Sequence, residues 1–343
     1  MEILMKYINK QSSSKNITIG DIARDLGLSK TTISRAISGK GRIGAETKKR
    51  VHDYILEHNY RPNLVAKGLA QSKTYNIGVV LPADANLTEI PFFQSCLMGI
   101  CEAAASMDYD VLITTVTDDD ISLLKRLIDN QKVDGIVLTR SLVHDLPAEY
   151  LKDTGIPFVL IGTSEDGDIV QIDSDHEAGC CELTTLVLKT GCERVALLAG
   201  NQNHMVNRSR YQGYKKAFLD TGKEIDNDLV FLNTNNNILI QKAVNTILDR
   251  GADCILCSDD FICFRVLTHL EEMNIAIPDR IKVASFYNSS HLENHNPPIT
   301  ALNINIKELG VTAGKHLIKI ISSGTASHKS LVNYEIVLKK STS

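Results

Sequence analysis

The pair Cys254-x-x-Cys257 has the spacing of two metal ligands or of a redox-active dithiol. It lies in the apolar run Cys-Ile-Leu-Cys, which is typical of a strand interior, and no second paired motif follows it. Cys180 and Cys181 fall on an expected helix, as do Cys96 and Cys101. We therefore expect the eight cysteines to be reduced, buried thiols that act as small hydrophobic side chains.

The acidic run Asp118–Asp120 could in principle hold a metal ion. It comes just before an expected helix, where carboxylates interact favourably with the helix dipole, so we interpret it as a solvated helix start. The ten histidines show no ligand spacing, and the chain has no phosphate loop, dinucleotide fingerprint, nucleophile elbow or H-E-x-x-H motif. We therefore expect no catalytic residue, no metal and no cofactor.

A helix-turn-helix is predicted within residues 17–63, followed by a basic third helix and a short linker. Ala23 is small enough for two helices to cross closely, and Gly27 can take the positive φ of a tight turn. Ser29 stands where the second helix needs a cap. Apolar contacts between the two helices come from Ile22, Leu26, Leu28 and Ile33. In such a motif the second helix enters a DNA major groove, although an αα-hairpin in an ordinary core has the same outline.

Charge is distributed unevenly along the chain. The whole chain has a net charge of −4, but residues 17–73 contain 11 Lys and Arg against 5 Asp and Glu. The first sixteen residues are also basic, so the rest of the chain carries the acidic excess. A basic head on an acidic body is the asymmetry expected of a nucleic-acid-binding protein whose body does not bind DNA.

Length and composition indicate a soluble protein with two or three domains. A chain of 343 residues is too long for one core, and 43% hydrophobic and 23% charged residues are ordinary values for globular proteins. There is no run of about 18 apolar residues that could span a membrane. The N-terminus lacks the basic start and long apolar stretch of a signal peptide, so we expect a cytoplasmic protein.

From Asn76 onward, apolar strands alternate with helices, and the alternation restarts after Asp173. This pattern predicts βαβ units and parallel sheets in two lobes. The expected fold is an all-α helix-turn-helix head followed by an α/β body of two doubly wound lobes, as in periplasmic binding proteins. Because such sheets bind ligands at the carboxyl ends of their strands, the cleft between the lobes is the expected binding site.

Motifs of a known family run through head and body. The head carries Thr18-Ile19-x-Asp21-Ile22-Ala23, Gly27-Leu28-Ser29-x-x-Thr32-Ile33-Ser34-Arg35 and Thr47-x-x-Arg50-Val51. These are followed by Asn59-Tyr60-x-Pro62-Asn63-x-x-Ala66-x-x-Leu69 and Ile77-Gly78-Val79. The body adds Arg210-x-x-Gly213-Tyr214-x-x-Ala217 and Ser258-Asp259. With these motifs the chain resembles the LacI/GalR-type bacterial transcription regulators from about residue 17 onward.

The resemblance implies which residues contact DNA. Lys30 and Thr31 open the second helix and would face base edges, and Arg35 would reach a guanine or a phosphate. Arg42, in the loop before the third helix, is a further candidate. Side chains suited to phosphate contacts, which position a protein without reading sequence, are those of Ser29, Thr32 and Ser34. Thr18 belongs to the same DNA-binding set.

The segment from Asn63 to Ala70 resembles the hinge helix of the family. It is short, and Gly68 in its interior weakens it by about 1 kcal/mol, so it is expected to form only on DNA beside the copy from a second subunit. Leu69 would then be a wedge in the minor groove, unless it is an ordinary linker residue. Asn63 is the expected N-cap, and Ala66 belongs to the same DNA-facing set.

The resemblance also implies residues for a small-molecule effector in the cleft. Arg210 could clamp hydroxyls or a carboxylate with its planar guanidinium, or it could be a surface arginine. Asp259 would bond a ligand hydroxyl or only cap the next helix. Phe92 and Phe93 would stack on a ligand ring or belong to the core.

One strand end departs from the family pattern. Many members carry an acidic pair where this chain has Tyr287 and Asn288, so a carboxylate that would hold sugar hydroxyls is missing there. The chain also has no Trp, a common sugar-stacking residue. Both facts weaken the case for a plain sugar. Tyr287 and Asn288 could still bind a ligand through neutral hydrogen bonds and the aromatic ring.

Domain boundaries follow from these patterns. We expect a flexible tail (1–16), a DNA-binding domain (17–61), a hinge and linker (62–75), and an effector-binding and dimerisation core (76–343). Within the core, lobe 1 is expected over about 76–173 and 303–330, and lobe 2 over about 174–302 and 331–343.

The sequence thus predicts a transcriptional regulator, most simply a repressor. It would bind a near-palindromic double-stranded DNA operator as a homodimer, with no membrane partner. A small molecule in the cleft, a sugar or sugar derivative, would change operator affinity. The alternatives are a solute-binding protein, a regulator that answers to a protein partner instead, and an enzyme on an α/β fold.

Overall fold

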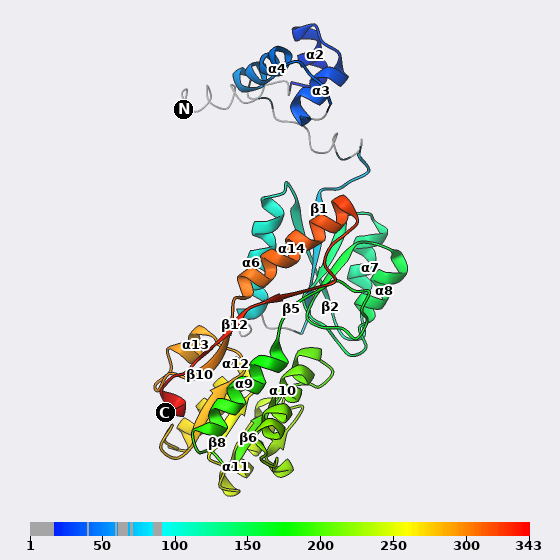
Figure 1. Ribbon diagram of the computed structural model, residues 1–343. Coiled ribbons are helices and arrows are strands. Elements are labelled where there is room, and N and C mark those ends of the chain that lie inside the picture. The colour runs from blue at the N-terminus through cyan, green and yellow to red at the C-terminus, as the bar shows by residue number, and fades with distance from the viewer. Residues whose placement is uncertain (1–16, 40, 59, 61–67, 69–70, 85–90) are drawn as a thin grey trace, which may run out of the picture. The chain divides into compact units, whose positions relative to one another are not determined.

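The computed structural model describes residues 17–39, 41–58, 60, 68, 71–84 and 91–343 (Figure 1). The chain divides into two compact units, Met1–Lys73 and Thr74–Ser343. The expected contacts of Asn63, Ala66 and Leu69 lie outside the described residues.

The first unit contains the predicted helix-turn-helix. Its helices are α2 (Ile19–Leu26), α3 (Lys30–Ser38) and α4 (Ala45–Glu57). Gly27 takes φ +66° between α2 and α3, and its amide donates to the carbonyls of Ala23 and Arg24. The Ser29 hydroxyl caps α3 by accepting from the Thr32 amide at 3.0 Å. Side chains of all three helices form the small core, which includes Ile22, Ala23, Ile33, Ala36 and Val51.

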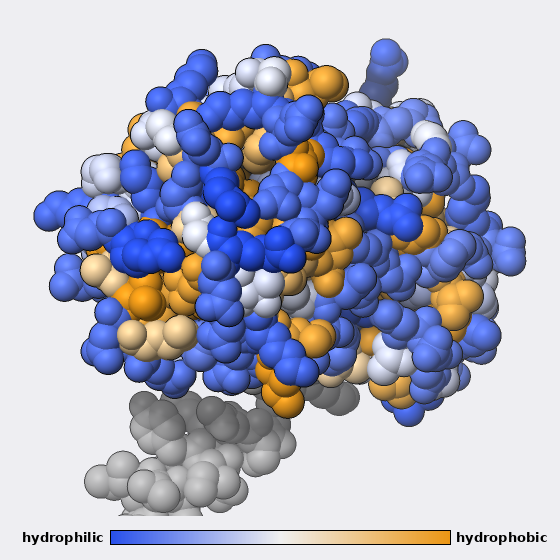
Figure 2. All heavy atoms as spheres, turned by 90° about the horizontal axis from the view of Figure 1, so that it is seen from below, coloured by the Kyte–Doolittle hydropathy of each residue, from blue (hydrophilic) through white to orange (hydrophobic). Residues whose placement is uncertain are grey.

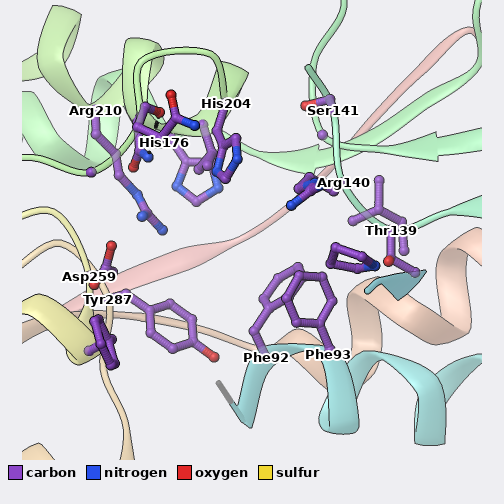
Figure 3. Close-up of a pocket in the computed structure, with 18 of the residues that line it drawn as sticks. Phe92, Phe93, Thr139, Arg140, Ser141, His176, His204, Arg210, Asp259 and Tyr287 are labelled. Atoms are coloured by element: carbon purple, nitrogen blue, oxygen red, sulfur yellow. Dashed lines mark hydrogen bonds between the residues drawn. The ribbon is translucent and has the colours of Figure 1, made fainter. Parts of the chain in front are cut away.

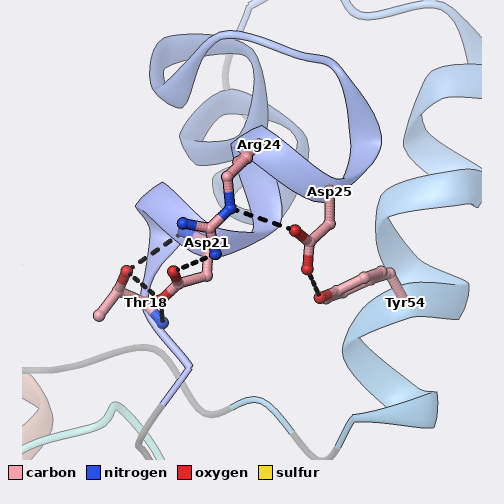
Figure 4. Close-up of polar contacts among 5 residues, drawn as sticks. All are labelled: Thr18, Asp21, Arg24, Asp25 and Tyr54. Carbon is pink, nitrogen blue, oxygen red and sulfur yellow. Dashed lines mark hydrogen bonds and ion pairs between the residues drawn. The ribbon is translucent and has the colours of Figure 1, made fainter.

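Polar contacts stabilise both ends of α2 (Figure 4). Thr18 and Asp21 form a capping box, in which each side chain accepts from the other residue's amide. Arg24 pairs with Asp21 at 2.7 Å. The Tyr54 hydroxyl on α4 donates to Asp25 at 2.6 Å, which ties the third helix to the first. These contacts support the pair of helices against which α3 is held.

The second unit contains two six-stranded sheets. The lobe 1 sheet has the order β11-β5-β4-β3-β1-β2 and all its pairs are parallel. Its strands are β1 (Asn76–Pro82), β2 (Asp110–Val116), β3 (Gly135–Leu138), β4 (Phe158–Ile161), β5 (Gln171–Ser174) and β11 (Lys329–Val332). Helices α6 (Pro91–Ala105) and α14 (Ile306–Ser323) pack against each other in this lobe. Its other helices are α7 (Ser122–Asp129) and α8 (Leu146–Thr154).

The lobe 2 sheet has the order β12-β10-β9-β8-β6-β7 and is parallel except for β12. Its strands are β6 (Val195–Leu198), β7 (Val230–Phe231), β8 (Cys254–Cys257), β9 (Lys282–Ser285), β10 (Thr300–Ile304) and β12 (Tyr334–Val337). The helices of this lobe are α9 (His176–Lys189), α10 (Met205–Thr221), α11 (Asn237–Asp249), α12 (Asp260–Glu272) and the short α13 (Ser290–Glu293). Two 3-10 turns lie at Asn227–Leu229 and Lys340–Thr342.

The chain passes between the sheets three times, after Ser174, after Ile304 and at Asn333. Each lobe is therefore made from separate stretches of chain. The predicted fold class, a helix-turn-helix head with two doubly wound lobes, is confirmed.

Glycines allow α6 and α14 to approach closely in lobe 1. A Cβ at Gly99 would meet the Lys307 carbonyl, and a Cβ at Gly310 would meet the Cys96 carbonyl. Any side chain at either position would force the helices apart.

The face of the molecule in Figure 2 is mainly hydrophilic, with apolar side chains in small separate groups. Within the part of the chain that the structure describes, no helix has the length and apolar character needed to cross a membrane.

Candidate functional site

The expected DNA-contacting side chains of the described head lie mostly at its surface. Lys30, Thr31, Ser34 and Arg35 are exposed on α3, and Arg42 is exposed in the loop that follows. The stem of Lys30 lies over the first turn of α2, where a Cβ on Gly20 would come within 3.3 Å of its Cε. The second helix thus presents a row of hydrogen-bond donors at its start.

The hydroxyl residues of the head have structural partners as well. Ser29 and Thr32 interact with each other, with 2.9 Å between their hydroxyl oxygens, and Thr18 is occupied by the capping box. Caps of this kind accept a hydrogen bond from a backbone amide of the first turn that has no partner within the helix. These residues therefore position α3 whether or not they touch phosphate.

The cleft between the lobes contains a cavity of about 310 Å³ (Figure 3). Its walls come from the carboxyl ends of strands in both sheets. Lobe 1 contributes Pro82 at the end of β1 and Thr139–Ser141 after β3, and lobe 2 contributes Asp259 and Asp260 after β8. This is the position at which doubly wound sheets bind ligands.

Arg210 is held in the wall of the cleft by the helix around it. It lies on α10, and Gly213, less than one turn later, allows α10 to approach α9, because a Cβ there would meet the Glu177 carbonyl. Tyr214 is fully buried and donates from its hydroxyl to the Val195 carbonyl at 2.8 Å. The motif Arg210-x-x-Gly213-Tyr214 therefore places the arginine by packing, and the alternative of a surface arginine is wrong, since Arg210 is 7% exposed.

Arg210 forms no ion pair with any described residue, and its Nε is buried without a hydrogen-bond partner. Figure 3 shows its guanidinium directed toward the cavity. Three neighbouring polar atoms in the same wall are also buried without partners, namely Ser174 Oγ, His176 Nδ1 and Asn207 Oδ1. Because buried polar groups are normally hydrogen-bonded, this wall has an unusual number of groups available to a ligand.

Two neighbouring carboxylates at the end of β8 have different surroundings. Asp259 caps α12, with one oxygen accepting from the Ile262 amide at 2.8 Å and the other from the Ser258 hydroxyl at 3.1 Å. Asp260 is the first residue of α12 and only 6% exposed, and it forms no ion pair within the described chain. Burial, followed by the charge of Asp259, raises the pKa of Asp260 to about 6. The nearby Ser289 hydroxyl and Arg210 charge partly offset that rise.

Aromatic side chains line the opposite part of the cavity. Phe92 and Phe93 meet edge to face with 5.2 Å between ring centroids, and Phe92 meets Tyr287 in the same manner at 6.4 Å. Figure 3 shows the Tyr287 ring pointing from lobe 2 toward the two phenylalanines of lobe 1. Burial raises the pKa of the Tyr287 hydroxyl, which therefore stays a neutral donor and acceptor. One face of a ligand would rest on these rings.

Asn288 is the one expected effector residue that does not line this cavity. Its amide nitrogen donates to Glu293 Oε1 at 2.8 Å, and the residue lines a second cavity instead. The expected residues that the structure does bring together in the cleft are Phe92, Phe93, Arg210, Asp259 and Tyr287.

Arg140 and His204 also line the cleft, and sequence reasoning missed both. Arg140 pairs with Asp84 at 3.0 Å and with Asp118 at 2.8 Å, so the acidic run serves partly as its counter-charge. Burial, followed by the Arg140 charge, lowers the pKa of His204. The rule that residues just after parallel strands face the cleft would have found Arg140 after β3 and Asp260 after β8.

The described residues contain no group of three or more His, Cys, Asp or Glu side chains that could hold a metal ion. All eight cysteines are free thiols, as predicted, and six of them are buried. Cys101 and Cys181 are only half-buried, so the expectation of burial does not hold for these two.

Two family models match the chain. The model described as "Bacterial regulatory proteins, lacI family" matches residues 18–63, which span the helix-turn-helix. The model described as "Periplasmic binding proteins and sugar binding domain of LacI family" matches residues 74–341, which span both lobes.

Similar proteins cover almost the whole chain. The HTH-type transcriptional regulator MalR of Streptococcus pneumoniae serotype 4 is 28% identical over 338 residues, covering 94% of this chain and 99% of MalR. A solved complex of the transcriptional regulator CelR with cellobiose has a TM-score of 0.72 at 24% identity, covering 95% of this chain and 99% of that one. The lac repressor dimer bound to operator and the anti-inducer ONPF has a TM-score of 0.75 at 21% identity, covering 96% and 99%. At these identities the two solved structures show the fold alone.

Proposed function

Because the chain belongs to the LacI family of bacterial regulatory proteins, we propose that it is a repressor whose operator affinity is set by a small sugar-like effector in the inter-lobe cleft. Its role as a DNA-binding transcriptional regulator agrees with the sequence motifs and with the names of its relatives. No catalytic activity is proposed. A regulator that binds chromosomal DNA works in the cytoplasm of a bacterium.

The proposed operator is a near-palindrome bound by a homodimer, because two-fold symmetry in a protein is mirrored in two half-sites. Lys30 and Thr31 are proposed to read base edges, and Arg35 and Arg42 to contact a base or a phosphate. Exposure of these four side chains on one small unit supports this assignment. Ser29, Thr32, Ser34 and Thr18 are proposed as phosphate contacts in addition to their roles as caps.

One observation carries the effector proposal: Arg210 and Asp260 line the same cavity, both are buried, and they form no ion pair with each other. A buried charge without a counter-charge is costly, so the cavity suits a ligand that satisfies both groups. Hydroxyl groups do this, since one hydroxyl can donate to the carboxylate and its neighbour can accept from the guanidinium. A sugar also presents an apolar ring face, which fits against Phe92, Phe93 and Tyr287.

Asp260 thus replaces the carboxylate that is missing at Tyr287. In this proposal Asp259 acts through the helix that it caps, while Asp260 contacts the ligand. The cellobiose in the solved CelR complex is of the proposed chemical class. The identity of the sugar follows from screening rather than from these contacts.

The test is calorimetric titration of the full-length protein with a panel of mono- and disaccharides. Arg210→Ala should weaken binding of the sugar found by about 10- to 100-fold, the range for losing charged hydrogen bonds. Arg208→Ala is the matched control, because Arg208 is exposed on the same helix. Equal affinities for both variants would exclude the cleft as the effector site.

The operator side is tested by selecting bound sequences from random duplex DNA at a defined salt concentration. A palindrome is expected, with a pyrimidine–purine step at its centre, where insertion of Leu69 would kink the duplex. Leu69→Ala should then weaken specific binding far more than non-specific binding. Sequence-blind, salt-sensitive binding would remove the regulator proposal and leave a solute-binding role for the body.

A further inference from the structure

A second cavity, of about 700 Å³, lies between the lobes and shares Tyr287, Ile304 and Ile306 with the cleft. Tyr287 is therefore part of the wall between the two spaces. The volume is within the range of small-molecule sites, about 300–1,000 Å³. The second cavity is chemically different from the cleft, because Arg210, Asp259 and Asp260 do not line it.

The second cavity joins three parts of the body. Pro91 and Ser95 come from α6 of lobe 1. In lobe 2, Asn288 precedes α13 and Ser290 is its first residue. Asn303 and Ile304 end β10, Asn305 lies in the second crossing between the sheets, and Asn333 lies in the third. A molecule held here would touch both lobes and two of the crossings that join them.

The charged side chains around this cavity already have partners. Lys307 pairs with Glu102 at 2.7 Å, and Glu335 accepts from the Asn303 amide at 2.8 Å. Glu308 lies in the first turn of α14, where it accepts from Asn305 and offsets the positive end of the helix dipole. The other polar groups at this cavity are neutral amides and hydroxyls, which lie beside the exposed carboxylates of Glu308 and Glu335.

The unpaired amide oxygen of Asn288 is the strongest evidence that this cavity binds a ligand. Asn288 is 9% exposed, and its amide nitrogen is fixed on Glu293, which settles the orientation of the amide. Its Oδ1 is buried with no hydrogen-bond partner among the described residues. A buried acceptor without a donor is unfavourable, and a ligand hydroxyl that donates to it would remove that cost.

We propose that this second cavity is a binding site for a small neutral polyol, separate from the effector site of the cleft. The neutral donors and acceptors fit a ligand whose hydroxyls both donate and accept, and Asn288 Oδ1 is the expected acceptor for one of them. Because Tyr287 borders both cavities, a ligand in one affects the wall of the other. Binding here would bias the lobe orientation without using Arg210.

The experiment is saturation-transfer NMR on the full-length protein with D-glucose as the neutral probe. All measurements use the Arg210→Ala background, so that binding in the cleft is suppressed. Ser95→Trp places a large side chain in the second cavity. Gln94→Trp is the matched control, because the neighbouring Gln94 is exposed on the same helix and lines neither cavity. Equal urea midpoints for the two Trp variants establish that both fold.

The glucose signal should persist in Arg210→Ala and in Arg210→Ala/Gln94→Trp, and fall at least several-fold in Arg210→Ala/Ser95→Trp. A signal unaffected by Ser95→Trp, or absent from Arg210→Ala, would overturn the proposal. Inorganic phosphate is the second probe, because α6 and α14 both begin at this cavity. Displacement of glucose by phosphate would mean an anion site and would also overturn the neutral class. The cleft proposal is judged separately, by the titration of Arg210→Ala against Arg208→Ala.

Discussion

Leu142 of lobe 1 and His204 of lobe 2 are joined by an antiparallel backbone bridge across the cleft. On either side of it, the Val143 amide donates to the Asn203 carbonyl at 2.9 Å, and the Met205 amide donates to the Ser141 carbonyl at 3.1 Å. These contacts are additional to the three covalent crossings. They tie the two lobes together in the arrangement that the structure shows.

Met205→Pro should favour the open arrangement of the lobes. Met205 is the first residue of α10, a position that tolerates proline, and His204 before it is extended (φ −84°, ψ 123°), as proline requires. The substitution removes the amide that donates to Ser141 and places a ring carbon against that carbonyl. One such bond contributes about 0.5–1.5 kcal/mol, so effector binding should weaken roughly 2- to 10-fold.

Small-angle scattering and calorimetric titration would measure this effect. Met205→Ala keeps the amide and is the control. If Met205→Pro left both the radius of gyration and the affinity at the values of the control, the bridge would have no part in closure.

Asp260 should make stability and effector binding depend on pH in opposite directions. Its pKa in the folded protein is raised from 3.8 to about 6, so the folded state holds its proton more tightly than the unfolded state. This contribution to stability is present below about pH 4 and is lost as pH rises through 6. Binding of a hydroxyl-rich effector needs the ionised carboxylate, so it should strengthen over the same interval.

The pH effect is measured by urea unfolding and by effector titration between pH 4.5 and 7.5, comparing wild type with Asp260→Asn. Asp260→Asn should show neither the fall in stability nor the rise in effector affinity between pH 4.5 and 7.5. A wild-type binding profile that matched that of Asp260→Asn would show that the carboxylate does not contact the ligand.

Ser29→Ala should weaken binding to every DNA sequence by a similar factor. The Ser29 hydroxyl caps α3, and losing such a cap costs about 0.5–2 kcal/mol, so a smaller fraction of the head would be folded. Ser29→Asn keeps a capping side chain and should restore binding. Thermal unfolding of the head and fluorescence anisotropy with operator and random DNA provide the comparison. A loss confined to operator DNA would instead assign Ser29 to base reading.

Gly99→Ala should destabilise lobe 1. A Cβ at this position meets the backbone carbonyl of Lys307 on α14, and relieving such overpacking costs about 1–3 kcal/mol. Met98→Ala, at the exposed neighbouring position of α6, should have little effect. Urea unfolding measures both. Equal midpoints for the two variants would show that α6 and α14 can separate without cost.

Much of the fold follows from the sequence because hydrophobic periodicity reports burial directly. The run Cys254–Cys257 predicts a strand buried on both faces, and all four residues are buried in β8. Gly27 and Ser29 likewise predict the turn and cap of the head, because local backbone geometry demands those residue types.

The binding site was less predictable because it depends on geometry that no periodic pattern records. Asp259 and Asp260 are adjacent residues of the same type that both line the cavity. Asp259 is extended and caps α12, whereas Asp260 is its first helical residue. Asn288 turns away from the cleft because Glu293, five residues later, holds its amide. Such choices are made by the local path of the backbone.

The three crossings also affect how the protein matures on the ribosome. Lobe 1 receives α14 and β11 from residues 306–332, so its sheet and the helix pair α6–α14 stay incomplete until nearly all of the chain has been synthesised. The head, by contrast, consists of one short continuous stretch. N-terminal domains generally fold first during translation, so the head can fold while lobe 1 still exposes the apolar surface that α14 later covers. Until α14 has been synthesised, the nascent protein therefore exposes a large apolar surface to which chaperones can bind.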